Sequence, residues 1–241
     1  MRIGVSKADI TPPIGIRLGG YAARYKGSEG IHDPLHARAL YVEGREESVL
    51  LIANDLVNVP NHIVTKVRSE IAGRTKLKGS SIMISATHTH SGPSQEGILI
   101  SDPAISPSDS VSPDSVRDYF KTLPEKMVEV AIEARGCAQN AKVGWGTSKA
   151  SIAFNRRERD GPVDPEVSVF IARNGSGRAI GSLVDYACHG VVLGDKNYLI
   201  SADYPGAVAS RIENESGPGH ISLFTNGATG DLNPITSVGY A

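Results

Sequence analysis

The chain has 241 residues, of which 40% are hydrophobic, with 25 basic and 26 acidic side chains and two cysteines. This length suffices for one large domain or two small ones with a substantial core. The balanced charge, without a run of Lys or Arg, argues against nucleic acid or an anionic membrane as a partner. Two cysteines are too few for a disulfide framework, and no apolar stretch is long enough to span a bilayer.

The N-terminus lacks the apolar core of a secretory signal peptide. We therefore expect a cytoplasmic protein with no stable membrane insertion. A secreted domain whose leader has been removed would have the same sequence.

The first half of the chain predicts a hairpin, a helix and a further strand. Residues 38–42 and 48–53 are expected to form strands joined by a polar turn. Apolar residues at helical spacing predict a helix at 61–74, and the apolar run 81–86 predicts another strand. Residues 92–112, rich in Ser, Pro and Asp, read as a long loop.

The second half alternates helices and strands. From residue 113 apolar spacing marks a helix, in which Pro124 predicts either a kink or the start of a second helix. We expect strands at 142–147, 167–172, 179–187 and 220–225, and a helix at 203–214. This order predicts an α/β fold in one domain, with a mixed, largely buried β-sheet covered by helices.

The sequence ATHTHSGP at residues 86–93 places His88 and His90 two positions apart, directly after a predicted strand. In an extended strand, side chains at i and i+2 point to the same face, so both imidazoles would project together. Neutral imidazole is the commonest protein ligand for zinc, so this is where a metal would bind. The alternative is a pair of surface histidines at a loop entrance.

Three more loops that follow predicted strands carry polar residues, at 54–55, 185–190 and 226–234. Sites in α/β proteins form beyond the carboxyl ends of strands, so these loops are expected to converge with 87–93. Each has a simpler interpretation. His189 could be a core histidine, Asp55 and Asp203 could be helix caps, and the glycine-rich loop lacks the Gly-Lys-Ser/Thr ending of a P-loop.

Several motifs occur in a fixed order along almost the whole chain: ADITPPIG (8–15), GIHDP (30–34), ATHTHSGP (86–93), NR (155–156), CHG (188–190), SADYPG (201–206) and GDLNP (230–234). Together they resemble the N-terminal catalytic domain of the neutral/alkaline, non-lysosomal ceramidase family. The resemblance implies a Zn²⁺-dependent amidase that hydrolyses the N-acyl bond of ceramide-like lipids.

The same resemblance implies roles for individual residues. His88 and His189 match metal ligands, and His90 matches an active-site histidine beside the metal. Arg156 falls near the reaction centre, and His32 lies in a motif that resembles the rim of the active site.

Two departures from the family change the expected chemistry. Asn233 occupies the position of the active-site serine, so hydrolysis would use metal-bound water as the nucleophile, and Asn233 could donate a hydrogen bond to an oxyanion. The family's further ligands, a glutamate and a tyrosine, come from sequence well beyond the glycine-rich loop. Either the chain is truncated at its C-terminal end, or Asp55, Asp203 and Asp231 are the remaining candidates.

Three hypotheses follow. The first is a zinc-dependent hydrolase of an amide or related acyl bond, with a small-molecule amide or N-acyl substrate more soluble than ceramide. The second is a non-catalytic protein that keeps the ceramidase scaffold and binds a ligand. The third is a metal-dependent phosphoesterase, suggested by aspartates beside histidines.

Overall fold

The computed structural model describes residues 1–93 and 112–236 of the chain. Its main feature is one mixed sheet with the strand order β11-β9-β8-β6-β1-β3-β4-β5. The strands are β1 (Arg2–Asp9), β3 (His36–Glu43), β4 (Ser48–Asn54), β5 (Ile82–Ala86), β6 (Gln139–Lys149), β8 (Glu166–Asn174), β9 (Ala179–Tyr186) and β11 (Ile221–Asn226). The pairs β4–β5 and β9–β11 are parallel, and the other neighbours are antiparallel.

The sheet folds over on itself, so that its two halves face each other. Strand β11 lies against β3, β4 and β5, although it is at the opposite end of the strand order. The buried side chains between the halves form an inner core of Ile3, Leu40, Ala53, Ala172, Ile180 and Leu223.

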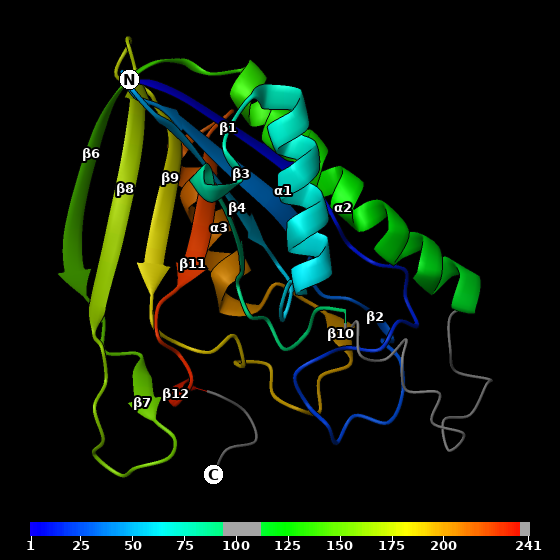
Figure 1. The fold of residues 1–241 in the computed structure, drawn as a ribbon. Helices are drawn as coiled ribbons and strands as arrows, with labels where there is room; N and C mark the ends of the chain where they lie inside the picture. Colours follow the sequence, from blue (N-terminus) through cyan, green and yellow to red (C-terminus); the bar gives the residue numbers. More distant parts are fainter. Residues whose placement is uncertain (94–111, 237–241) are drawn as a thin grey trace.

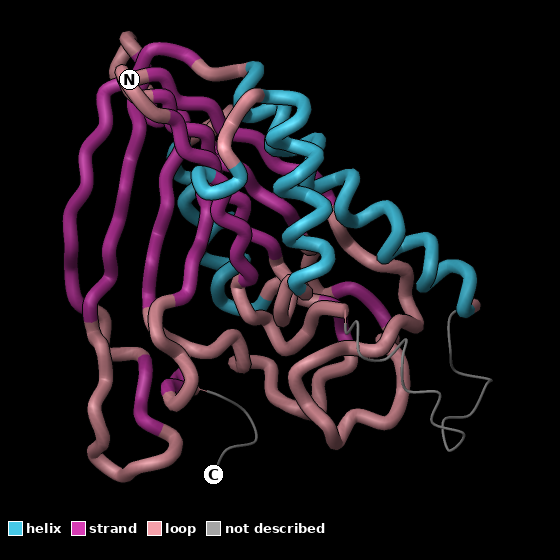
Figure 2. Tube along the Cα trace, in the orientation of Figure 1, coloured by secondary structure: helices cyan, strands magenta, loops and turns pink. Residues whose placement is uncertain are grey.

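Helices cover the outer faces of both halves (Figures 1 and 2). Helices α1 (Asn61–Thr75) and α2 (Pro113–Gly136) pack together over β1, β3 and β4, and α3 (Asp203–Ser216) packs on β11. The arrangement is therefore helix, sheet, sheet, helix. Along α1 the apolar residues Ile63, Val67 and Ile71 are spaced by one turn and are all buried, which fixes the helix on the sheet.

The helix ends follow local chemistry. The Ser112 side chain accepts a hydrogen bond from the Ser115 N–H at the start of α2. Helix α1 ends where Lys76 adopts a left-handed conformation (φ 64°) and donates its N–H to the Ala72 carbonyl.

The predicted mixed α/β fold is confirmed, with differences in detail. The hairpin β3–β4 and the helix α1 lie where predicted. Pro124 lies inside a single helix, α2, so it does not start a second one. Strand β1 was not predicted, and residues 94–111 of the expected loop lie outside the described residues. The helical cover is also uneven, because β6 is exposed along most of its length, with Trp145 79% exposed.

At the loop end of the sheet, two pairs of short strands hold distant segments together (Figure 1). Strand β2 (Gly30–Ile31) pairs with β10 (Leu199–Ile200), and β7 (Ala153–Asn155) pairs with β12 (Leu232–Pro234). A 3-10 helix at Gly79–Ser81 leads into β5. Among the described residues, no helix is both long and apolar enough to cross a membrane.

Candidate metal centre

Four loops converge at the carboxyl ends of β4, β5, β9 and β11, as predicted. Thr89 forms an isolated bridge with Gly190, and the His90 N–H donates to the Gly190 carbonyl (3.0 Å). The His189 N–H donates to the Leu232 carbonyl (2.9 Å), which adds the glycine-rich loop. Thr87 donates its N–H to the Asn54 carbonyl (2.8 Å), which adds the loop after β4.

Gly190 permits one of these close approaches. A Cβ atom at this position would lie 3.1 Å from both the His88 carbonyl oxygen and the Thr89 Cα. The sharp turn after His189 therefore brings the two histidine-bearing segments together without a side chain between them.

The histidine pair does not project from an extended strand. Strand β5 ends at Ala86, and His88 has a left-handed backbone conformation (φ 61°). A non-glycine residue in this region is uncommon and is often found at functional sites. The imidazoles still meet, but a turn places them together instead of the i, i+2 alternation of a strand.

Three imidazoles form one cluster, from His88, His90 and His189. Their ring centroids are 4.9 Å apart for His88–His90, 4.8 Å for His88–His189 and 5.4 Å for His90–His189. One ring nitrogen from each lies within 4.8 Å of the others, a spacing that could hold a metal ion. His90 and His189 are buried and His88 is half-buried, so the alternative of two surface histidines is wrong.

Backbone carbonyls fix the ring orientation of two of the three histidines. The Nδ1 of His88 lies 2.7 Å from the Val57 carbonyl oxygen, and the Nδ1 of His189 lies 3.2 Å from that of Leu232. A carbonyl only accepts, so Nδ1 carries the proton in both rings and Nε2 presents its lone pair. This is the usual second contact of a metal-binding histidine. The donor set therefore fits zinc.

The surroundings favour the neutral form of His90 and His189. Burial lowers the pKa of His90 to about 3, and the neighbouring charges of His88, His189, Arg24 and Arg156 act in the same direction. Burial also lowers the pKa of His189, with help from His88 and Arg156. Neutral imidazole is the form that binds a metal.

Asn233 is fully buried. It directly follows Leu232 in the sequence, the residue whose carbonyl contacts His189. Among the described residues neither its side-chain oxygen nor its nitrogen has a hydrogen-bond partner. A buried amide without partners is rare in folded proteins and indicates a group that awaits a ligand or water. Its type and position fit the predicted hydrogen-bond donor.

Arg156 and His32 do not join the cluster. The Arg156 guanidinium donates to the Gly230 carbonyl (2.8 Å), so it braces the glycine-rich loop. His32 is exposed, and its Nδ1 lies 2.7 Å from an Asp33 carboxylate oxygen. Asp33 in turn accepts from the Ser201 hydroxyl, and Ser201 donates its N–H to the Ser91 carbonyl.

The three candidate aspartates have other partners. Asp55 pairs with Arg38 (2.7 Å), and Asp231 accepts from the Asn155 amide (2.8 Å). Asp203 accepts from the backbone N–H groups of residues 192, 193 and 204 and is not the N-cap of α3, a position held by Ala202. Within residues 1–93 and 112–236 no carboxylate joins the histidine cluster, which removes the main support for a phosphoesterase.

The cluster also has a wall that was not predicted from the sequence. Gly20, Tyr21 and Arg24, in the loop between β1 and β2, contact His90. The only signal for them was the position of this loop between two of the family-like motifs, at 8–15 and 30–34.

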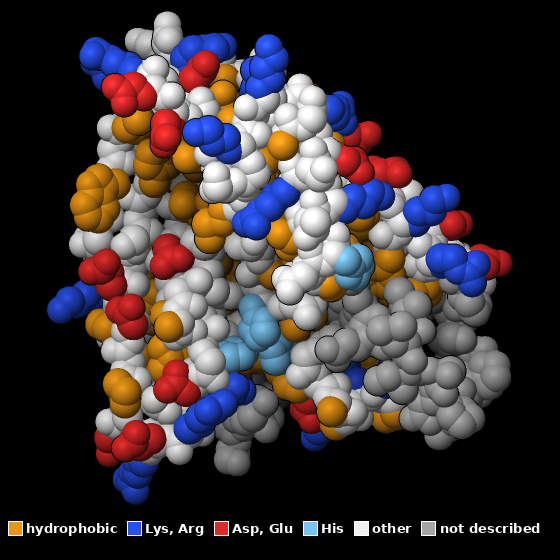
Figure 3. Space-filling view, viewed as in Figure 1, with side chains coloured by type: hydrophobic (Ala, Val, Ile, Leu, Met, Phe, Trp, Pro, Cys, Tyr) orange, Lys and Arg blue, Asp and Glu red, His pale blue; other side chains and the backbone are white. Residues whose placement is uncertain are grey.

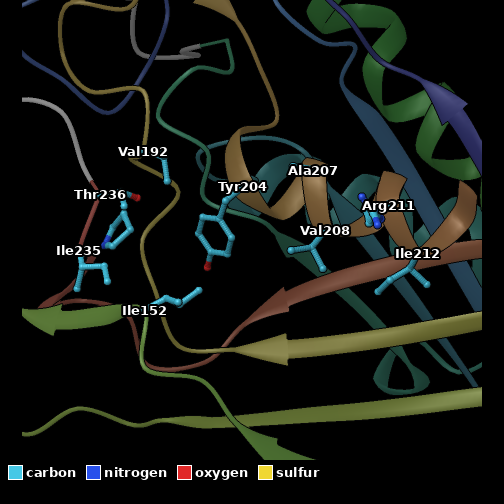
Figure 4. A pocket seen from close by; sticks show the side chains of 10 residues that line it. Ile152, Val192, Tyr204, Ala207, Val208, Arg211, Ile212, Ile235 and Thr236 are labelled. Atoms are coloured by element: carbon cyan, nitrogen blue, oxygen red, sulfur yellow. The ribbon is translucent and has the colours of Figure 1, made fainter. Parts of the chain in front are cut away.

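An apolar cavity of about 510 Å³ lies beside α3 (Figure 4). Tyr204, Val208 and Ile212 line it from the helix, opposite Ile152 and Ile235 from neighbouring loops. None of the three clustered histidines lines this cavity. In the space-filling view, histidine side chains gather instead near the lower centre of the face shown, over the ends of the strands (Figure 3).

Comparison with known proteins supports the resemblance drawn from the motifs. Residues 1–99 match the family described as neutral/alkaline non-lysosomal ceramidase, N-terminal. The chain is 24% identical to neutral ceramidase B of Dictyostelium discoideum, covering 98% of this chain and 36% of that protein. It is also 24% identical to the neutral ceramidase of Pseudomonas aeruginosa, covering 97% and 37%. The chain thus spans a little over a third of the length of these curated relatives.

Solved structures agree with the fold. The crystal structure of the Pseudomonas aeruginosa neutral ceramidase superposes with a TM-score of 0.79 at 22% identity, covering 97% of this chain and 39% of that one. A ceramidase complexed with C2 superposes with a TM-score of 0.82 at 22% identity, covering 97% and 38%. The resemblance is therefore confirmed, and the chain shares the fold of these ceramidase structures.

Proposed function

We propose that this chain provides the metal-binding part of a hydrolase that cleaves an amide or related acyl bond, with zinc as the metal. The observation that carries the proposal is the cluster of His88, His90 and His189, in which two rings are oriented by carbonyls through Nδ1. Three neutral imidazoles are a known ligand set for catalytic zinc. Zinc bound in this way activates water and polarises the carbonyl under attack.

The chain's own residues supply the rest of the site. His88 and His189 would hold the metal through Nε2, and His90, whose Nε2 lies 3.3 Å from that of His88, would either complete the ligand set or carry a proton to the leaving amine. The unpartnered amide of Asn233 would donate to the oxygen that becomes negative. Arg156 adds positive charge beside the two buried histidines.

The substrate class rests on the relatives, which are neutral ceramidases. We propose an N-acyl compound as the substrate, because the chain has the fold of an amidase family. The family's serine position holds Asn233, so the nucleophile would differ. Pro234, the residue after Asn233, is one of the residues that line the apolar cavity beside α3. We propose that this cavity takes the apolar acyl group.

The decisive test is metal analysis by mass spectrometry on chelator-free protein, comparing the wild type with H88A and H189A. We expect about one zinc per chain in the wild type and loss of zinc in both variants. H62A, a change at an exposed position on α1, is the matched control and should keep the metal. Zinc that survives both H88A and H189A would overturn the assignment.

A second candidate function is ligand binding without turnover, favoured by Asn233 at the position of the family's serine. It predicts that metal-loaded protein binds an N-acyl compound but releases no amine. Detectable metal-dependent turnover of any amide or ester would exclude it. Gain of turnover in N233S alone would support it, because the scaffold would then lack only the nucleophile.

A further inference from the structure

The loop between β1 and β2 packs against His90. The Gly19 N–H donates to the Gly92 carbonyl (2.9 Å), and Leu18 forms an isolated bridge with Pro93. Gly20 has φ +88°, and a Cβ there would lie 2.2 Å from the His90 Cγ. The loop backbone therefore rests directly on the imidazole of His90.

Tyr21 adds an aromatic contact on the same ring. Its centroid lies 4.9 Å from that of His90 with an interplanar angle of 76°, an edge-to-face arrangement. The His90 ring is thus confined by Gly20 and Tyr21, as well as by the two other histidines.

Arg24 is a buried cation whose hydrogen bonds go to backbone carbonyls. It is only 3% exposed, and its Nη1 donates to the carbonyls of Gly19 (2.9 Å) and His90. Its Nη2 donates to Gly194 (3.2 Å), and its Nε donates to Asp195 (3.3 Å). The Tyr21 ring lies 4.7 Å from the guanidinium carbon, a cation–π distance. Within residues 1–93 and 112–236 no carboxylate hydrogen-bonds to the Arg24 guanidinium, and a buried charge without such a partner costs stability.

We infer that Arg24 is a positioning residue that fixes His90 in the metal centre. The guanidinium joins three segments, at residue 19, at residue 90 and at 194–195, while the His90 N–H is held by the Gly190 carbonyl. Both the backbone N–H and the backbone carbonyl of His90 are therefore held by neighbouring segments of the site. The inference rests on the proposed metal site, and it names the residue that orders that site.

The planar fork of arginine is what this geometry requires. The three nitrogens of one rigid group together reach carbonyls in three segments, at residue 19, at residue 90 and at 194–195. A lysine ammonium on a flexible stem cannot reproduce this. The positive charge beside His90 also disfavours a protonated imidazole. Charge and fork can be separated experimentally, because R24K keeps the charge and loses the fork, whereas R24M loses both.

The test measures His90 directly and needs no turnover. Side-chain ¹⁵N resonances of the histidines are recorded by NMR for metal-free wild type, R24M, R24K and R68M. Arg68 is the matched control, because its Nε also donates to a backbone carbonyl, that of Ile82 (2.9 Å), away from the cluster. Co²⁺ affinity is then measured by titration calorimetry for the same four proteins.

We expect R24M and R24K to shift the His90 resonances while those of His220 stay in place, and R68M to shift neither. Co²⁺ binding should weaken by about 10- to 100-fold in both Arg24 variants, the usual effect of losing a residue that orients a ligand. Unchanged His90 resonances in folded R24M would overturn the inference, as would R24K behaving like the wild type. Failure of both variants to fold would overturn it too, since Arg24 would then support the whole domain.

The two proposals fail in different ways. A wild-type chain that binds no Co²⁺ contradicts the proposed metal site, yet the metal-free NMR comparison still reports whether Arg24 orders His90. Normal Co²⁺ binding in folded R24M contradicts the positioning role and leaves the metal site in place.

Discussion

Asn233 is a buried polar side chain whose burial opposes stability. It is fully buried and has no hydrogen-bond partner for either polar atom among the described residues. Leaving a buried polar group unpaired costs about 1–3 kcal/mol. We therefore expect N233L to raise the free energy of unfolding by about 1 kcal/mol, because the unpaired amide is replaced by a side chain of similar size.

The same variant should lose activity. Removal of an oxyanion donor lowers kcat by about 10²- to 10³-fold, and zinc content should not change because Asn233 is not a proposed ligand. Urea unfolding, metal analysis and amide turnover on N233L test this combination. N140L, at an exposed position on β6, is the control and should alter neither stability nor rate. A less stable N233L with an unchanged rate would show that the amide has a structural role.

At the scale of residues, the sequence identified the clustered histidines but not how they are held. The spacing of His88 and His90 suggested an extended strand, whereas the backbone of His88 is left-handed. That conformation depends on contacts with Val57 and Gly190, which are distant in sequence. The wall formed by Arg24 was missed for the same reason, since its partners are carbonyls of residues 90, 194 and 195.

At the scale of elements, the parallel pair β9–β11 contains a buried polar cluster. The Ser182 hydroxyl lies 2.9 Å from both the His220 Nε2 and the Ser222 Oγ, and all three residues are buried. Burial lowers the pKa of His220; the nearby charge of Arg173 acts in the same direction, and that of Glu213 opposes it. The folded chain therefore favours the neutral ring.

This cluster predicts acid sensitivity. Well above a pH of about 6.5 the ring is neutral in both folded and unfolded chains, and its contribution to stability is complete. As the pH falls below that value, the unfolded chain binds a proton that the folded chain does not, so the free energy of unfolding decreases. We expect H220Q to flatten this decrease by up to about 1.4 kcal/mol per pH unit, the effect of one proton.

Urea unfolding of metal-free protein between about pH 7 and pH 5 measures the slope, across the range in which histidines titrate. H62Q, at an exposed position on α1, should leave the slope unchanged. Equal slopes for wild type and H220Q would mean that the acid sensitivity arises elsewhere, for instance at His36, whose pKa burial also lowers.

Element positions were predicted where side-chain periodicity is strong and missed where pairing partners decide. Helix α1 and the hairpin β3–β4 show clear apolar patterns, and both lie within one to two residues of the predicted ranges. Strand β1 has a mixed pattern and is a strand because its full length pairs with β3. The folding of the sheet onto itself depends on contacts between β11 and β3, β4 and β5, which no local pattern specifies.

At the scale of the whole molecule, one ion-pair network joins the layers. Arg38 on β3 is 3% exposed and pairs with Asp55 at 2.7 Å, and its Nε lies 3.5 Å from the Glu213 carboxylate on α3. Glu213 also pairs with Lys7 on β1 at 2.6 Å. Asp55 accepts a further hydrogen bond from the Thr87 hydroxyl, so the network reaches the segment that carries His88.

Breaking this network should destabilise the fold far more than breaking a surface pair. R38M leaves the carboxylate of Asp55 buried without its cation, so we expect the free energy of unfolding to fall by about 3–5 kcal/mol. R211M removes an exposed pair with Glu215 on the same helix as Glu213 and should cost about 0–1 kcal/mol. Urea unfolding of both variants gives the comparison.

A double-mutant cycle decides whether the loss comes from the pair itself. If Arg38 acts mainly by compensating Asp55, then D55N in the R38M background should recover part of the lost stability, with a coupling of about 0.5–3 kcal/mol. Additive losses would contradict that explanation and would indicate that Arg38 stabilises the layers through packing of its long side chain.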